Sequence, residues 1–141
     1  MKNDHVHLVP IIDAGVKIEE GYETYEEGIA GDYFCKREDG SNFEAAVWPG
    51  LTHFPDVLNK DARKWFGEKY DFLLSQGIDA FWNDMNEPAI FYTPESMEET
   101  QALAKSVLSG ESEYPPAALP YIFRMSHNIE KDYANIYHNM D

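Results

Sequence analysis

Residues 78–88 read Ile78-Asp79-Ala80-Phe81-Trp82-Asn83-Asp84-Met85-Asn86-Glu87-Pro88. The first half of this segment is short and aromatic and is flanked by turn-forming residues, which predicts a β-strand. Alternation along a strand places Trp82 and Asp84 on one face and Asn83 on the other. Pro88 biases the preceding residue toward an extended backbone, so the regular strand is expected to end near Met85.

A helix is predicted directly before this strand. Asn59 is a good N-cap residue, and Gly77 is a typical residue just beyond a helix end. Gly67 inside the helix costs about 1 kcal/mol relative to alanine, so the helix depends on packing its apolar face. That face follows the 3.6-residue period and consists of Ala62, Trp65, Phe66, Tyr70, Leu73 and Leu74.

A second strand is predicted earlier in the chain, over residues 6–12, from a run rich in Val and Ile. Pro10 conflicts with a central position in a sheet because it has no N–H to donate. Residues 15–52 show no sustained periodicity, and we expect a long excursion with short β pieces around 33–36 and 45–48. Excursions of this length inside a domain are usually functional or disordered.

Residues after 92 carry weaker signals. Ser96 and Glu99 have the spacing of a capping box, which predicts a helix that begins at Ser96 and ends at Gly110. A proline-rich connection follows at 114–120, and residues beyond it give mixed signals.

The order strand, excursion, helix, strand predicts βα units and a parallel sheet. A complete (β/α)8 barrel needs about 250 residues. The expected fold class is therefore α/β, a partial (β/α)8 TIM barrel with about two consecutive βα units and a long inserted loop. We expect residues 1–141 to be a single fragment of such a barrel.

Composition excludes several classes of function. The chain has 26 Asp and Glu against 11 Lys and Arg, giving a net charge of −15, so its surface should repel nucleic acid and anionic membranes. A lone cysteine, Cys35, and an amino terminus without an apolar signal segment favour a soluble, cytoplasmic protein. His5 and His7 could share a metal, but no third ligand accompanies them, and we expect structural or surface roles for the histidines.

Residues 81–88 resemble the W-x-D-M-N-E signature of glycoside hydrolase family 31, the α-glucosidase and α-xylosidase family. Residues 8–13 (Leu-Val-Pro-Ile-Ile-Asp) resemble the preceding barrel strand of that family, and residues 47–50 (Val-Trp-Pro-Gly) resemble its V-W-P-G loop. Phe34-Cys35-Lys36 occupies the place where the family often has an aromatic residue, any residue and lysine. The resemblance extends from about His7 to Phe91.

The resemblance implies roles for seven side chains. Asp84 would be the catalytic nucleophile of a retaining mechanism, and Asp13 would accept hydrogen bonds from sugar hydroxyls. Asn86 and Glu87 would orient the loop behind the nucleophile. The walls of the sugar pocket would be Trp48, Trp82 and Met85. The resemblance implies an α-glucoside oligosaccharide as substrate, and no cofactor or metal.

Without the resemblance, ordinary structural roles would be favoured for Asp84, Glu87 and Trp48, and would be as well supported as a sugar contact for Asp13. Asp84 and Glu87 could be solvated acids on a turn, Asp13 a turn acid after a strand, and Trp48 a core residue. The interpretation that we prefer is an α-glucosidase, with α-xylosidase as an alternative of the same family. A small carbohydrate-binding or interaction module without catalysis is an alternative of another class.

The general acid/base carboxyl group is missing from the recognised motifs. A retaining glycosidase needs this group about 5 to 5.5 Å from the nucleophile, and the family supplies it from a later barrel strand. We therefore expect the isolated chain to be inactive. Faces that the rest of a barrel would cover should be exposed, so self-association is also expected.

Overall fold

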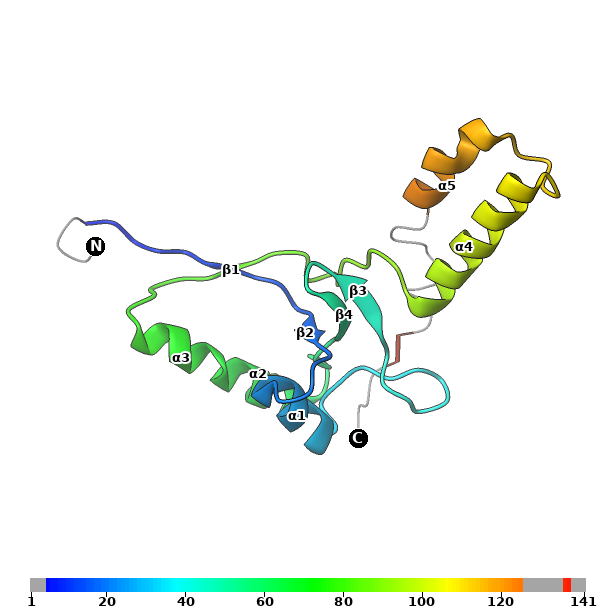
Figure 1. The fold of residues 1–141 in the computed structure, drawn as a ribbon. Helices are drawn as coiled ribbons and strands as arrows, with labels where there is room; N and C mark the ends of the chain where they lie inside the picture. Colours follow the sequence, from blue (N-terminus) through cyan, green and yellow to red (C-terminus); the bar gives the residue numbers. More distant parts are fainter. Residues whose placement is uncertain (1–4, 126–135, 138–141) are drawn as a thin grey trace.

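The computed structural model of the chain describes residues 5–125 and 136–137 (Figure 1). Its central feature is a pair of parallel strands, β1 (Ile11–Ile12) and β5 (Trp82–Asn83), with Ile11 opposite Trp82. The N–H of Trp82 donates to the carbonyl of Pro10 at 2.9 Å, so Pro10 serves the ladder as an acceptor. The predicted parallel pairing is confirmed.

Both strands are shorter than the sequence predicts. The predicted strand over residues 6–12 is regular only at Ile11–Ile12. Over the described residues, β1 has a strand neighbour on one side, β5, and the preceding segment has no ladder partner. A continuous apolar run shows that a segment can be buried, but ladder bonds require a neighbouring strand.

The excursion between the two parallel strands folds into a small α+β unit. Its antiparallel sheet has the order β2-β4-β3, formed by β2 (Val16–Lys17), β3 (Ala45–Val47) and β4 (Gly50–His53). The predicted β piece near 45–48 is confirmed as β3, and the piece near 33–36 appears as isolated bridges at Phe34 and Lys36. The described residues thus form two separate small sheets rather than a closed barrel.

Helix α1 (Glu23–Ala30) lies within the excursion and was not predicted. Its N-cap residue makes no side-chain cap hydrogen bond, and the sequence offers only a weak apolar face. Packing explains the helix: Gly28 lets the fully buried ring of Phe34 approach the helix backbone. This ring packs with Val16 and Trp65 in one of two hydrophobic clusters. The other cluster contains Cys35, Phe43, Ala45, Val47, Phe54 and Ile90.

The predicted helix over 59–77 is present as two consecutive helices, α2 (Lys60–Glu68) and α3 (Tyr70–Ser75). The N-cap prediction is confirmed, because Oδ1 of Asn59 accepts the backbone N–H of Asp61 at 2.8 Å. At the junction the N–H of Lys69 bonds to the carbonyl of Phe66, a tighter i to i+3 bond that interrupts the α-helical pattern. Gly77 follows with a positive φ of 90°.

Helix α4 (Pro94–Ser109) begins earlier than predicted. Thr93 is the N-cap, and Ser96 is its partner three residues later: Thr93 N–H donates to Ser96 Oγ at 2.8 Å. Pro94 suits the first helical position because its φ is already helical. The predicted end at Gly110 is confirmed by a left-handed φ of 79°. A short 3₁₀ turn (Pro116–Ala118) leads into α5 (Leu119–Met125), and Figure 1 shows α4 and α5 as a hairpin that stands away from the sheets.

A pair of alanine substitutions tests the packing of α1. A Cβ atom on Gly28 would lie 2.2 Å from Cζ of Phe34, so Gly28→Ala should lower the free energy of unfolding by about 1–3 kcal/mol. Gly67→Ala, in α2, meets nothing within 4 Å and should raise the same free energy by about 1 kcal/mol. Urea denaturation of both variants measures the difference, and equal effects at the two sites would contradict this packing.

Candidate active site

The carboxylates of Asp13 and Asp84 come together because each residue directly follows one of the parallel strands. The N–H of Asp84 donates to the carbonyl of Ile12 at 3.2 Å, which extends the ladder to the edge of the site. Burial raises the pKa of Asp13, and the negative charges of Asp84 and Glu87 raise it further. The three carboxylates are therefore within electrostatic reach of one another at the carboxyl ends of β1 and β5.

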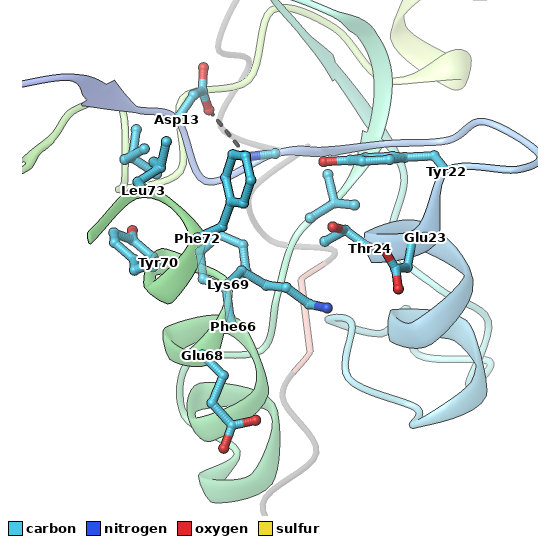
Figure 2. Close-up of a pocket in the computed structure, with 13 residues that line it drawn as sticks. Asp13, Tyr22, Glu23, Thr24, Phe66, Glu68, Lys69, Tyr70, Phe72 and Leu73 are labelled. Atoms are coloured by element: carbon cyan, nitrogen blue, oxygen red, sulfur yellow. Dashed lines mark hydrogen bonds between the residues drawn. The ribbon is translucent and has the colours of Figure 1, made fainter. Parts of the chain in front are cut away.

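Asp13 is held at a tight turn between β1 and β2. Its Oδ1 atom accepts the backbone N–H of Gly15 at 3.2 Å, shown as the dashed line in Figure 2. A Cβ on Gly15 would lie 2.7 Å from Cγ2 of Val47, so only glycine lets the turn pass this close to the sheet. The Oδ2 atom of Asp13 is buried and has no hydrogen-bond partner among the described residues. This side chain thus keeps a free acceptor at a cost in desolvation.

Asp84 is held by the residue that follows it. The N–H of Met85 donates to Oδ1 of Asp84 at 3.0 Å, and Met85 itself has a positive φ of 54°. A non-glycine residue in this left-handed region costs about 1–3 kcal/mol and is frequent at functional sites. The Met85 N–H therefore places one backbone donor on the Asp84 carboxylate.

Trp48 reaches the site from the turn between β3 and β4. Its indole Nε1–H donates to Sδ of Met85 at 2.9 Å, and its ring lies edge-on to Phe91 with centroids 5.0 Å apart. The segment after the site is bonded to β3, because Phe91 N–H donates to the carbonyl of Ala46 at 2.9 Å. Trp48 is 74% exposed, which excludes the core role that its residue type would otherwise favour.

The three remaining candidates, Trp82, Asn86 and Glu87, lie on the segment that carries Asp84. Trp82 is 58% exposed and, by strand alternation, shares the face of Asp84. Asn86 and Glu87 are exposed residues in the turn after β5. Both line a cavity of about 460 Å³ together with Cys35 and Phe54. Burial raises the pKa of the Cys35 thiol to about 12, so this thiol is not a reactive nucleophile.

A larger cavity of about 590 Å³ lies beside Asp13 (Figure 2). The helices α1, α2 and α3 surround it, and Figure 2 shows the side chain of Lys69 extending toward Glu23 and Thr24. Sequence reasoning missed this cavity because its lining comes from elements without a motif. Besides Asp13 the lining includes Tyr22, Glu23, Phe66, Lys69, Tyr70 and Phe72.

Within the described ranges, no group of three or more His, Cys, Asp or Glu side chains is arranged to hold a metal ion. His7 instead contacts Asp79 at 2.8 Å, and His53 is buried with its Nδ1 2.8 Å from the carbonyl of Phe43. His5 lies outside the region of the candidate site, in the exposed segment before β1. No helix in the described part of the chain combines the length and apolar character needed to cross a bilayer.

The burial of Asp13 makes a prediction about stability. Because the pKa of Asp13 in the folded state lies above the ordinary value of 3.8, ionised Asp13 destabilises the folded state. This penalty is absent below pH 3.8, where the carboxyl group is protonated in both states, and it develops as the pH rises through the folded pKa. Asp13→Asn should therefore raise the free energy of unfolding at neutral pH, and this advantage should shrink below pH 3.8. Urea denaturation at both pH values measures it.

The matched control is Asp39→Asn. Hydrogen bonds from Ser41 lower the pKa of Asp39, so its ionised form stabilises the folded state and the substitution should give no gain at neutral pH. A gain for Asp39→Asn equal to that for Asp13→Asn would show that a general reduction of negative charge is responsible. That result would contradict the burial argument.

Comparison with known proteins identifies the family. A model of the glycosyl hydrolases family 31 TIM-barrel domain matches residues 1–140. Alpha-glucosidase 2 of Bacillus thermoamyloliquefaciens is 47% identical over 98 residues, which cover 70% of this chain and 12% of that protein. An alpha-glucosidase of Saccharolobus solfataricus is 38% identical over 87 residues, again covering 12% of the relative and 62% of this chain.

Comparison with solved structures indicates the same family. The family 31 alpha-glucosidase from Bacteroides thetaiotaomicron aligns with a TM-score of 0.55 and 40% identity over 60% of this chain and 14% of that chain. The ER glucosidase II heterodimeric complex aligns with the same score and identity, over 60% of this chain and 10% of the other. The chain thus spans about an eighth of the length of its first relatives, 12% in each case. It belongs to glycoside hydrolase family 31 and corresponds to a part of the TIM-barrel domain of that family.

Proposed function

We propose that this chain supplies the nucleophile side of the active site of a retaining α-glucosidase, with Asp84 as the nucleophile. The observation that carries the proposal is the position of Asp84, which follows β5 at its carboxyl end and lies within electrostatic reach of Asp13. The carboxyl ends of barrel strands are where the chemistry of this fold takes place. The relatives from Bacillus thermoamyloliquefaciens and Saccharolobus solfataricus are both named alpha-glucosidases, which favours this activity over that of an α-xylosidase.

The proposed reaction proceeds in two steps. An oxygen of Asp84 attacks the anomeric carbon of the terminal glucose, the glycosidic bond breaks, and the departing oxygen takes a proton from a second carboxyl group. Water then attacks the glycosyl-enzyme ester, and the resulting conjugate base takes the proton of that water. Two inversions at the same carbon give net retention. The N–H of Met85 on Asp84 Oδ1 leaves the other carboxylate oxygen available for attack.

The substrate would be held by an acceptor without a hydrogen-bond partner among the described residues and by exposed aromatic side chains. Oδ2 of Asp13 is a buried acceptor without a partner among the described residues, and a sugar hydroxyl would supply the missing hydrogen bond. Trp48 and Trp82, both before Asp84 in the sequence, are exposed aromatic surfaces suited to the C–H faces of a sugar ring. The raised pKa of Asp13 fits this role, because the cost of its burial is offset when the hydroxyl binds.

The general acid/base is proposed to come from a part of the barrel outside this chain. Asp13 follows a strand parallel and adjacent to that of Asp84, and Glu87 is on the same loop as the nucleophile, so neither faces Asp84 across a sugar. Residues 1–141 alone should accordingly show no hydrolysis of an aryl α-glucoside. The cytoplasmic location expected from the lone cysteine stays a prediction.

A chimeric enzyme tests the role of Asp84. Residues 7–91 would replace the matching segment of the Bacillus relative, so that the only nucleophile present comes from this chain. The chimera should hydrolyse an aryl α-glucoside and should become covalently labelled at Asp84 by a fluorinated glucosyl fluoride. Asp84→Asn should lower kcat by more than about a thousandfold. The melting temperature of the chimera should stay the same, which would show that the loss is not a loss of folding.

Asp79→Asn is the matched control, since Asp79 is an acid just before the same strand and its contact is to His7 at 2.8 Å. It should retain turnover within about twofold. A folded chimera that hydrolyses the substrate but carries the label on another residue would refute the assignment of Asp84. A folded chimera without turnover would favour the non-catalytic carbohydrate-binding module.

We also propose that the isolated chain self-associates through β1. Ile11 is 59% exposed, and Val6, Leu8 and Val9 before it are about half exposed, beside a strand edge that β5 does not cover.

Ile11→Lys should shift the chain toward monomer, because a charged residue on a strand edge opposes pairing. Light scattering at increasing concentration measures this. Leu108→Lys, at a leucine of α4 that is 70% exposed, should leave association unchanged, and a monomeric wild-type chain would contradict the proposal.

A further inference from the structure

Asn83 lies on β5 directly before the proposed nucleophile, and its side chain points to the face opposite Asp84. There the hydroxyl of Tyr70 donates a hydrogen bond to Oδ1 of Asn83 at 3.0 Å. The two side chains also share a small cavity of about 170 Å³ with Ile12 of β1 and Asn86 of the site loop. One hydrogen bond thus joins the first residue of α3 to the strand that carries the site.

Tyr70 is well anchored for this role. Its ring lies edge-on to Phe81, with centroids 4.7 Å apart, and edge-on to Phe66 at 5.9 Å. Phe66 in turn contacts Trp65 at 5.9 Å, and Trp65 meets the fully buried Phe34 at 5.8 Å. A continuous row of rings therefore runs from the core of the excursion to the residue before β5, and it fixes where the Tyr70 hydroxyl can be.

β5 needs such an anchor because its own ladder is short. The pairing with β1 covers two residue pairs, Ile11 with Trp82 and Ile12 with Asn83. It is flanked by backbone bonds from Trp82 N–H to the carbonyl of Pro10 at 2.9 Å and from Asp84 N–H to the carbonyl of Ile12 at 3.2 Å. Trp82 and Asn83 are themselves exposed. A shift of one residue in register would turn Asp84 to the opposite face, and a smaller displacement would change its distance from Asp13.

We propose that Tyr70 is a positioning residue that holds Asp84 at its working place in the site through the amide of Asn83. This inference rests on the proposed function of Asp84. Tyr70 does not touch the sugar in this arrangement; it acts through Asn83 and the β5 backbone. The bond should matter for the attack step more than for binding, since Asp13 and Trp48, which would bind the sugar, are on other segments.

Tyr70→Phe removes the hydroxyl and keeps the ring in the aromatic row. In the chimeric enzyme it should lower kcat about tenfold and leave KM within about twofold, because misplacement of a nucleophile by a fraction of an ångström slows attack strongly. Asn83→Leu should have a similar effect, and the double variant should be no worse than either single variant. The control is Tyr25→Phe, whose ring stacks on His53 at 5.9 Å in the excursion, and it should change neither constant.

A second measurement on residues 1–141 is independent of activity. In NMR spectra, Tyr70→Phe should move the side-chain NH₂ signals of Asn83 and speed hydrogen exchange at the Asp84 backbone amide. The side-chain signals of Asn59, whose Oδ1 caps α2, should stay in place. Unchanged Asn83 signals, or an unchanged kcat, would overturn the positioning role.

The outcomes separate this inference from the proposed function. If the chimera is labelled at Asp84 and Tyr70→Phe has the turnover of the wild type, Asp84 remains the nucleophile and the positioning role is wrong. If the chimera is labelled elsewhere, the proposed function is wrong and the positioning role falls with it. A lowered kcat with an equally lowered melting temperature for Tyr25→Phe and Tyr70→Phe would indicate a general loss of folding and also overturn the inference.

Discussion

The parallel register of β1 with β5 is the constraint on which the rest of this structure depends. It consists of few bonds, yet it brings together two carboxylates that are far apart in the sequence, because Asp13 and Asp84 each follow the carboxyl end of a strand. A parallel pair needs a long crossover connection, and here the excursion together with α2 and α3 supplies it. Every candidate site residue except Trp48 is within a few positions of one of these two strand ends.

The excursion serves both as a connection and as a wall of the site. Its own core forms around Phe34 and Phe43, so the turn that carries Trp48 has a folded base. Lys69 at the junction of α2 and α3 contacts the carboxylate of Glu27 in α1, and the indole N–H of Trp65 donates to the same carboxylate at 2.8 Å. These contacts lower the pKa of Glu27, chiefly through the hydrogen bond from Lys69, and join the excursion to the helix that leads into β5.

The parts of the fold that could be predicted are those with a local physical signal. Asn59 and Gly77 marked the ends of the helical region between the excursion and β5, and the order of elements indicated a parallel pair. Helix α1 could not be found this way, because it depends on the ring of Phe34 meeting Gly28 rather than on its own periodicity. The site divides similarly: Asp13 and Asp84 follow from strand ends and family resemblance, whereas the contact of Tyr70 with Asn83 arises only when α3 folds back on β5.

The two carboxylates at the strand ends are treated differently by their surroundings, and this difference supports the different roles proposed for them. Asp84 receives the N–H of Met85 from a backbone in the left-handed region, so local strain is accepted to place a donor on that carboxylate. Asp13 is desolvated, with one oxygen bonded to a turn N–H and the other left without a partner in the described part of the chain. A protein selected for stability alone would satisfy or replace such a group. An acceptor without a partner among the described residues, beside a carboxylate held by the Met85 N–H, is suited to a hydroxyl-bearing ligand whose reacting carbon must lie against Asp84.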